Sequence, residues 1–183
     1  MKFLKSVHNF DTYYDTPEFD LFKKAVFVRV RNHEYLQFKF NEQGDQAHVQ
    51  SKEYSFPLAA TPDLVEQMNK TFSFFLKSWS VSENFEAAIH QNDLIELATI
   101  DNRREIYLLE DMELSLDSVE GIGKFLEIEI RRQEGTDTQE ALAKIERFAS
   151  DLAVQPVTIR YVEMWLRVHK PHLYRLGRYQ ASE

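Results

Sequence analysis

The chain has 183 residues, 43% of them hydrophobic, and a formal net charge of −8 at pH 7. This length suits one domain with a substantial core, so we expect residues 1–183 to form a single domain. The negative charge argues against nonspecific binding of nucleic acid, which requires a basic surface. The absence of cysteine excludes disulfides, thiolate metal sites and a cysteine nucleophile.

The hydropathy pattern contains neither a membrane-spanning segment nor a secretion signal. No stretch of about 18 apolar residues occurs, and residues 1–11 lack an apolar core followed by a small-residue cleavage site. We therefore expect a cytoplasmic protein that has no membrane partner.

Alternating residues predict three consecutive strands near the start of the chain. The expected strands cover 25–31, 35–40 and 48–58, with turns at 32–34 and 41–46. In the first strand Arg29 and Arg31 share one face, and Val28 and Val30 share the other. In the second, Lys39 lies on the face opposite the phenylalanines. Each strand therefore presents one charged face and one apolar face.

Helical and strand patterns alternate over the rest of the chain. The expected helices cover 61–77, 82–90 and 136–152, with a short helix or mixed element over 158–168. The expected strands cover 94–109, 112–119 and 124–132. Many antiparallel strands with a few helices between them indicate an α+β fold, an antiparallel β-barrel (tunnel) with covering helices.

Periodicity alone leaves two interpretations of the charged strand faces open. In the first, Arg29, Arg31, Lys39, Glu127 and Glu129 face solvent and their apolar neighbours form the core. In the second, the apolar faces pack against helices and the charged faces line a wet interior. Two arginines at i and i+2 lie ~7 Å apart, which lets both bind neighbouring phosphates. Two glutamates with the same spacing offer hard oxygen ligands to magnesium or manganese.

Several segments resemble the CYTH superfamily of triphosphate tunnel metalloenzymes, which contains class IV adenylyl cyclases, thiamine triphosphatases and inorganic tripolyphosphatases. The resemblance extends from about His8 to Leu166 and favours the second interpretation. The segments that carry it are 13–17 (YYDTP), 25–31 (AVFVRVR), 103–107 (RREIY), 116–129 (LDSVEGIGKFLEIE) and 160–164 (RYVEM).

The resemblance implies a polar tunnel that holds a triphosphate together with Mg²⁺ or Mn²⁺. Asp117 would either bind metal or orient a basic neighbour. The implied mechanism needs no covalent nucleophile, because water or a ribose hydroxyl attacks phosphorus directly. The residues implied to bind phosphate are Arg29, Arg31, Lys39 and Arg104. The residues implied to bind metal and to act in catalysis are Glu127, Glu129 and Asp117.

The sequence departs from the family pattern at three points. The family's ExExK strand is absent from the sequence, Asn102 stands where lysine is usual, and Arg160 stands where serine is common. Without the ExExK carboxylates we expect triphosphate binding with slow hydrolysis. We also expect that supplying such a segment raises the rate at least ~100-fold, the upper scale for lost metal-shell groups.

We expect a metal-dependent hydrolase of inorganic or organic triphosphates, with tripolyphosphate, thiamine triphosphate or ATP as the small-molecule partner. Two alternatives stay open. One is a class IV type adenylyl cyclase that makes cyclic AMP and pyrophosphate. The other is a catalytically impaired module that binds polyphosphate or nucleotide. A homodimer is compatible with the sequence. We interpret His169 and His172 as surface residues rather than metal ligands.

Overall fold

The computed structural model describes residues 1–40, 52–59, 61–76, 79–81, 83–130, 138–157 and 159–179. Its strands are β1 (Lys2–Asp15), β2 (Phe27–Arg31), β3 (Tyr35–Phe40), β4 (Lys52–Pro57), β5 (Ile95–Leu109), β6 (Met112–Val119) and β7 (Gly123–Ile130). Its helices are α1 (Asp20–Lys23), α2 (Pro62–Ser73), α3 (Phe85–Gln91), α4 (Thr138–Asp151), α5 (Tyr161–His169) and α6 (Pro171–Tyr174).

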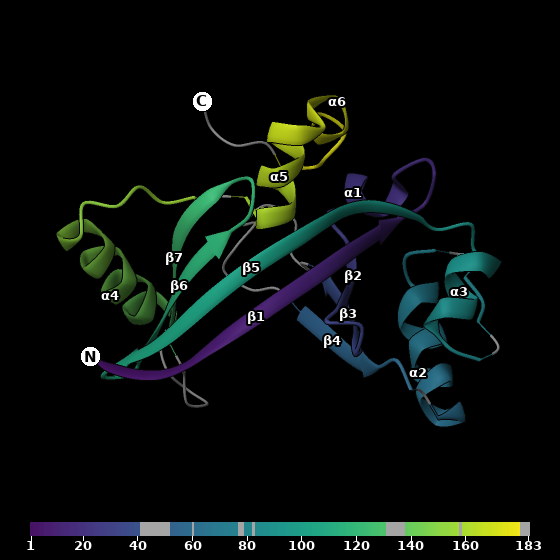
Figure 1. Cartoon of the computed structure of the whole chain (residues 1–183), viewed down its shortest axis with the longest axis horizontal. Helices are drawn as coiled ribbons and strands as arrows, with labels where there is room; N and C mark the ends of the chain where they lie inside the picture. Colours follow the sequence, from purple (N-terminus) through teal and green to yellow (C-terminus); the bar gives the residue numbers. More distant parts are fainter. Residues whose placement is uncertain are drawn as a thin grey trace. The chain divides into compact units, whose positions relative to one another are not determined.

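The strands form a seven-stranded sheet in the order β4-β3-β2-β1-β5-β6-β7 (Figure 1). The pairs β1–β2, β2–β3, β3–β4, β5–β6 and β6–β7 are antiparallel. The expected α+β class with an antiparallel sheet is confirmed. Within the described residues β4 and β7 stand at the two ends of the strand order.

Every strand and helix expected from periodicity is present in the described residues, with shifted boundaries. The segment 158–168, left open between a helix and a mixed element, is helix α5 from Tyr161. The turn expected at 41–46, the start of the strand expected at 48–58, and the residues 131–137 lie outside the described residues.

β1 is the one long element that periodicity does not predict. It runs over fourteen residues, yet its buried positions include the polar residues Asn9, Asp11 and Asp15. A strand with polar side chains on its buried face shows no clean alternation of polar and apolar residues, which is the signal that a strand prediction needs. The environment of Asp15 explains part of this pattern, because its carboxylate accepts hydrogen bonds from the backbone N–H groups of Leu21 and Phe22 in α1.

The chain divides into two compact units. The larger unit comprises Phe10–Ile100 and Thr158–Glu183, and the smaller unit comprises Met1–Asn9 and Asp101–Val157. β1 and β5 contribute residues to both. The single-domain expectation stays a prediction.

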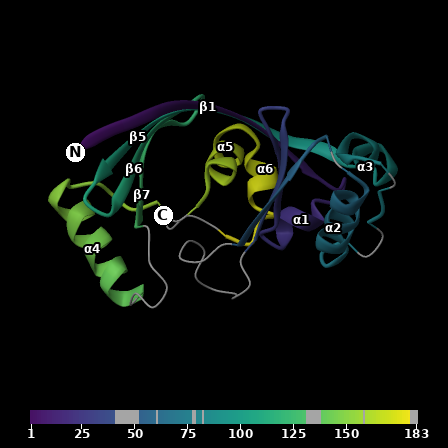
Figure 2. The ribbon, with the colours of Figure 1, turned by 90° about the horizontal axis from the view of Figure 1, so that it is seen from below.

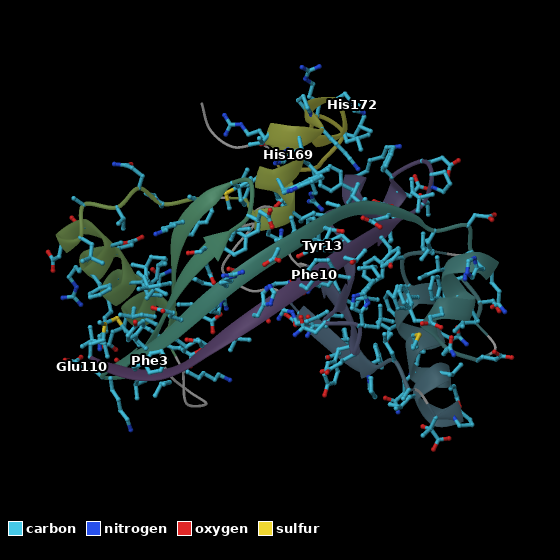
Figure 3. The ribbon with its side chains drawn as sticks, in the orientation of Figure 1. Phe3, Phe10, Tyr13, Glu110, His169 and His172 are labelled. Carbon is cyan, nitrogen blue, oxygen red and sulfur yellow. The ribbon has the colours of Figure 1, made fainter. Side chains whose placement is uncertain are left out.

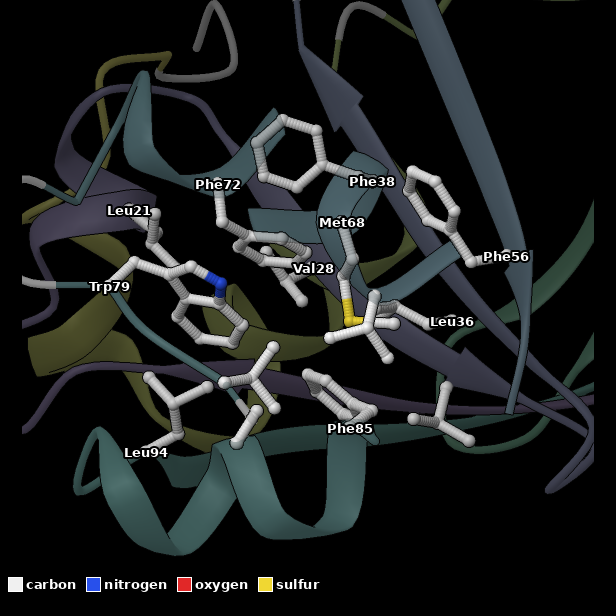
Figure 4. Packing of buried hydrophobic residues seen from close by; sticks show 14 of the residues in the cluster. Leu21, Val28, Leu36, Phe38, Phe56, Met68, Phe72, Trp79, Phe85 and Leu94 are labelled. Carbon is white, nitrogen blue, oxygen red and sulfur yellow. The ribbon is translucent and has the colours of Figure 1, made fainter. Parts of the chain in front are cut away.

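The core of the larger unit lies between the apolar face of β2–β4 and the helices α2 and α3. Val28 and Phe38 are fully buried and pack with Met68 and Phe72 of α2 (Figure 4). The rings of Phe38 and Phe72 lie 4.8 Å apart. The helices α2 and α3 lie side by side in both views (Figure 1, Figure 2). Burial of each large apolar side chain contributes about 1.5–3 kcal/mol to the free energy of folding. This burial holds one face of the sheet against the helices, so the opposite face is the one that carries polar groups.

The smaller unit contains the meander of β5, β6 and β7 and the helix α4, which contacts β7. A tight turn at Glu110 and Asp111 joins β5 to β6, with Glu110 in the left-handed region at φ 57°. Lys144 of α4 pairs with both of these carboxylates. Met112 and Leu114 are buried.

Candidate functional site

One face of the β1–β4 sheet in the larger unit is polar. Tyr13 lies on β1 (Figure 3). Arg29 of β2 lies opposite Tyr13 and opposite Gln37 of β3. Arg31 lies opposite Asp11. Because side chains on a strand alternate between faces, these residues project on the side away from the valine core. The residues of this polar face are Asp11, Tyr13, Phe27, Arg29, Arg31, Tyr35, Gln37, Lys39, Glu53 and Ser55.

Asp11 holds both arginines of the polar face. Nε and one terminal nitrogen of Arg31 donate to the two carboxylate oxygens of Asp11, each at 2.8 Å. Arg29 donates to the same carboxylate at 3.0 Å and to the hydroxyl oxygen of Tyr13 at 3.1 Å. The bidentate pair fixes the position of Arg31. Arg29 is shared among several partners, since its Nε also donates to Gln37 at 2.9 Å.

The carboxylate of Glu53 contributes longer ion pairs. Its oxygens lie 3.7 Å from Arg29 and 3.8 Å from Lys39, both beyond hydrogen-bond distance. Burial by itself would lower the pKa of Arg29, but the neighbouring Tyr13, Asp11 and Glu53 raise that pKa above its ordinary value. Arg29 is therefore charged at any working pH. Among the described residues, the three cations Arg29, Arg31 and Lys39 therefore share this face with the carboxylates of Asp11 and Glu53.

A second set of paired charges lies on β5 and β6 in the smaller unit. Nε of Arg104 donates to Asp117 at 2.7 Å and a terminal nitrogen donates to its other oxygen at 2.8 Å, while the same terminal nitrogen also reaches Glu127. Asn102 donates to Asp117 at 2.8 Å. The side chain of Asp117 is wholly buried, and all these contacts orient Arg104. Asp117 and Glu127 hold the pKa of Arg104 above its ordinary value against the effect of burial, which would lower it.

Three glutamates share the same face of β6 and β7. Glu129 lies opposite Glu113, and Glu127 lies opposite Ser115 on the same pair of strands. Burial raises the pKa of Glu129, and the negative charges of Glu127 and Glu113 raise it further. A divalent cation would relieve this repulsion.

The glutamates fit magnesium or manganese by the chemistry of their donors, which are hard carboxylate oxygens. Among the described residues, no three His, Asp or Glu side chains form a ready metal-binding group. Magnesium commonly takes one or two carboxylates and completes its shell with water and substrate phosphates. Glu127 and Glu129 meet that requirement.

All seven predicted site residues lie in the described part of the chain. Arg29, Arg31 and Lys39 come together on the polar face of the larger unit. The other four share one face of the smaller unit by register: Arg104, Asp117, Glu127 and Glu129. Their roles in substrate and metal binding stay predictions.

Four members of the polar face could not be recognised from the sequence as members of the site: Asp11, Tyr13, Gln37 and Glu53. Asp11 and Tyr13 lie two positions apart on β1, the strand without a clear alternation. Glu53 becomes a neighbour of Lys39 only through the register of β3 with β4, which no local pattern reveals. These partners can be identified only when the register of the paired strands is known.

The two C-terminal histidines are surface residues, as expected. His169 ends α5 and His172 lies in α6 (Figure 3), and both are exposed. The ring of His169 lies 4.5 Å from that of Trp165.

The comparisons with known proteins identify the family. The family model of the CYTH domain matches residues 1–161. The chain therefore belongs to the CYTH family, whose members are triphosphatases or adenylyl cyclase-like proteins. A search of curated protein sequences gave no match. None of the described helices is long and apolar enough to cross a membrane.

Solved structures share the fold at low sequence identity. A Pyrococcus horikoshii protein is 24% identical with a TM-score of 0.63, over 91% of this chain and 87% of its own. A Pyrococcus furiosus protein is 22% identical with a TM-score of 0.55, over 89% and 85%. A Hippeastrum protein, whose description pairs adenylyl cyclase with a dominant triphosphatase activity, is 19% identical with a TM-score of 0.51, over 98% and 86%. These similarities show that the chain shares its fold with these solved structures.

Proposed function

We propose that this chain is a metal-dependent hydrolase of inorganic or organic triphosphates. The observation that carries the proposal is the gathering of three cations, Arg29, Arg31 and Lys39, on one polar face of the sheet. The non-bridging oxygens of a triphosphate carry negative charge. Guanidinium groups bind such oxygens through charge-assisted hydrogen bonds. The triphosphatase activity in the description of the Hippeastrum protein supports this choice over a cyclase.

The arginines of the polar face have different tasks in this proposal. Arg31, fixed by two hydrogen bonds to Asp11, serves as a rigid positive charge. Arg29 and Lys39 bind phosphate oxygens directly, because both are cations on the same face of the sheet as Arg31.

In the smaller unit, Arg104 is the phosphate ligand and Asp117 is the residue that orients it. The two hydrogen bonds from Arg104 to Asp117 leave the guanidinium little freedom to rotate. Glu127 and Glu129 would hold Mg²⁺ or Mn²⁺, and the bound metal would stabilise negative charge on the phosphoryl oxygens. The chain needs no nucleophilic side chain, since water is the attacking group and the basic residues hold the phosphates in line for it.

Product analysis tests this proposal. The purified chain is incubated with tripolyphosphate, thiamine triphosphate and ATP, with Mn²⁺, with Mg²⁺ and with a chelator. We expect orthophosphate release that requires metal and that disappears in the double variant Glu127→Gln/Glu129→Gln, which controls for contaminating phosphatases. Cyclic AMP and pyrophosphate from ATP would instead establish the cyclase. Tight binding without any product would establish the binding module, and either result would overturn the hydrolase.

A further inference from the structure

The polar face of the larger unit consists of three cross-strand rows, each with one cation. Neighbouring rows lie two residues apart along a strand, or about 7 Å. Counted from the turn between β2 and β3, the rows are Asp11, Arg31 and Tyr35; Tyr13, Arg29 and Gln37; and Phe27, Lys39 and Glu53. The groups beside the cation differ from row to row, so the rows suit different parts of a ligand.

The first row presents an aromatic ring to solvent. Tyr35 lies directly opposite Arg31 and is 45% exposed, whereas the next residue, Leu36, projects from the other face and is fully buried. Among the described residues, no ring or cation stacks on Tyr35 and none hydrogen-bonds to its hydroxyl group. A single exposed aromatic residue is ordinary on a protein surface, so its neighbours decide what it does here.

The cation of the first row is already paired. Both carboxylate oxygens of Asp11 accept hydrogen bonds from Arg31, each at 2.8 Å. A bidentate pair of this kind balances the charge of the guanidinium and fixes its position. The first row therefore combines a paired charge with an open aromatic ring, which suits an uncharged planar group better than a phosphate.

The second row suits a phosphate. Nε of Arg29 donates to Gln37 at 2.9 Å, and the accepting atom is the carboxamide oxygen because a guanidinium group has only donors. The amide nitrogen of Gln37 keeps its two hydrogens, which no residue in the described part of the chain accepts. A guanidinium beside neutral N–H donors is an arrangement that binds phosphate oxygens.

We propose that Tyr35 is the stacking platform for the organic group of the substrate, and that it favours a triphosphate carrying a planar aromatic ring over inorganic tripolyphosphate. The inference rests on the proposed function. The phosphates bind at the row of Arg29 and Gln37, and the organic group extends along the strands to the neighbouring row. There its aromatic ring lies on the ring of Tyr35. ATP and thiamine triphosphate both carry such a ring.

The test compares Tyr35→Ala with the matched control Tyr54→Ala. Tyr54 is a 41% exposed tyrosine of β4 that lies opposite Phe38 and therefore on the other face of the same sheet. Both variants and the unaltered chain are titrated calorimetrically with ATP, thiamine triphosphate and tripolyphosphate, with a chelator present to prevent turnover. We expect Tyr35→Ala to weaken binding of the two organic triphosphates at least ~5-fold and of tripolyphosphate less than ~2-fold. Tyr54→Ala should leave the ratio of these affinities unchanged.

Two further measurements keep the test decisive. Tyr35→Phe keeps the ring and should bind as the unaltered chain does, so a loss as large as that of Tyr35→Ala would overturn stacking. The KM for phosphate release with Mn²⁺ should follow the same pattern in each variant, which gives a readout where binding without metal is too weak to titrate.

The outcomes separate this inference from the proposed function. An unchanged ratio of organic to inorganic triphosphate affinity in Tyr35→Ala would overturn the inference alone, and so would an unaltered chain that binds only tripolyphosphate. An unaltered chain that neither binds nor hydrolyses any of the three compounds would overturn the proposed function as well.

Discussion

Asp11 is the carboxylate on which the arrangement of the two β2 arginines depends. It is 4% exposed and accepts hydrogen bonds from both Arg29 and Arg31. Asp11→Ala would leave two like charges close together without compensation, which should cost about 3 kcal/mol of the free energy of unfolding. Urea denaturation measures this loss. The exposed Glu66→Ala in α2 is the control and should change stability by less than about 0.5 kcal/mol.

The same Asp11→Ala variant should respond strongly to ligand. A triphosphate that neutralises Arg29 and Arg31 replaces the lost carboxylate, so tripolyphosphate should raise the Tm of the variant by more than it raises the Tm of the unaltered chain. An equal or smaller rise in the variant would show that these arginines do not face the bound anion.

Glu163 makes stability depend on pH. Burial raises the pKa of Glu163 to about 6 in the folded protein. The hydrogen bond from the Arg160 backbone and the positive charge of Arg160 act in the opposite direction and lower this pKa. The carboxyl group ionises more readily in the unfolded chain, where its pKa lies near the ordinary value of 4.5. The stabilisation from protonated Glu163 is therefore complete below about pH 4.5 and is lost as the pH rises through 6.

Glu163→Gln removes this dependence. Between pH 4.5 and pH 7.5 the unaltered chain should lose about 2 kcal/mol of unfolding free energy relative to the glutamine variant, from a pKa difference of about 1.5 units. Urea denaturation of both proteins at the two pH values gives the comparison. A difference that does not change with pH, or that changes in the opposite direction, would contradict the assigned environment of Glu163.

At the scale of elements, β7 carries the glutamates that we assign to metal. Glu129→Gln should raise the Mn²⁺ concentration for half-maximal phosphate release by at least about 10-fold, the lower scale for losing a group of a metal site. Glu105→Gln is the matched control, because Glu105 is an exposed glutamate of the β5 strand that projects from the opposite face of the same sheet. Equal metal requirements in the two variants would remove Glu129 from the metal site.

The segment after α6 fits closely against α1. A Cβ atom at Gly177 would lie 2.7 Å and 2.8 Å from two ring carbons of Phe22, a side chain that is 1% exposed. Gly177→Ala should therefore cost about 1–3 kcal/mol through overpacking. The cost should shrink in a Phe22→Leu background, which removes the ring. Thermal denaturation of the four proteins gives the coupling, and additive costs would contradict the contact.

Most of the fold follows from periodicity. The charged and apolar faces of β2, β3 and β7 are visible in the sequence because one side of each strand packs against hydrophobic groups. The location of Val28 in the core and of Arg29 opposite it needed only the two-residue repeat. β1 could not be found in this way, since the residues it buries include asparagine and aspartate.

The partners of the site residues could not be predicted. Asp11 contacts Arg29 and Arg31 across a gap of 18 to 20 positions, and Arg160, close to the C-terminal end of the chain, contacts Phe27 of β2. Such contacts depend on strand register and helix docking, which a single sequence does not specify. Residue types indicated where charge lies, and the three-dimensional pairing decided which charges are compensated.

At the scale of the whole molecule, the protein carries a net charge of −8, so it cannot attract a polyanion through its overall field. Binding must come from the local cations of the polar face. The control for a local effect is an arginine that lies outside the polar face and whose replacement changes the net charge by the same amount. Arg147 of α4 is such a residue.

The most direct test of the central claim is the calorimetric affinity for tripolyphosphate of the unaltered chain, Arg29→Ala and Arg147→Ala, with orthophosphate as the reference anion. The account predicts that Arg29→Ala weakens tripolyphosphate binding by about 1.5–3 kcal/mol, the scale of a hydrogen bond to a charged group, with a smaller effect on orthophosphate. Arg147→Ala should bind as the unaltered chain does. Equal tripolyphosphate affinities in all three proteins would contradict the account.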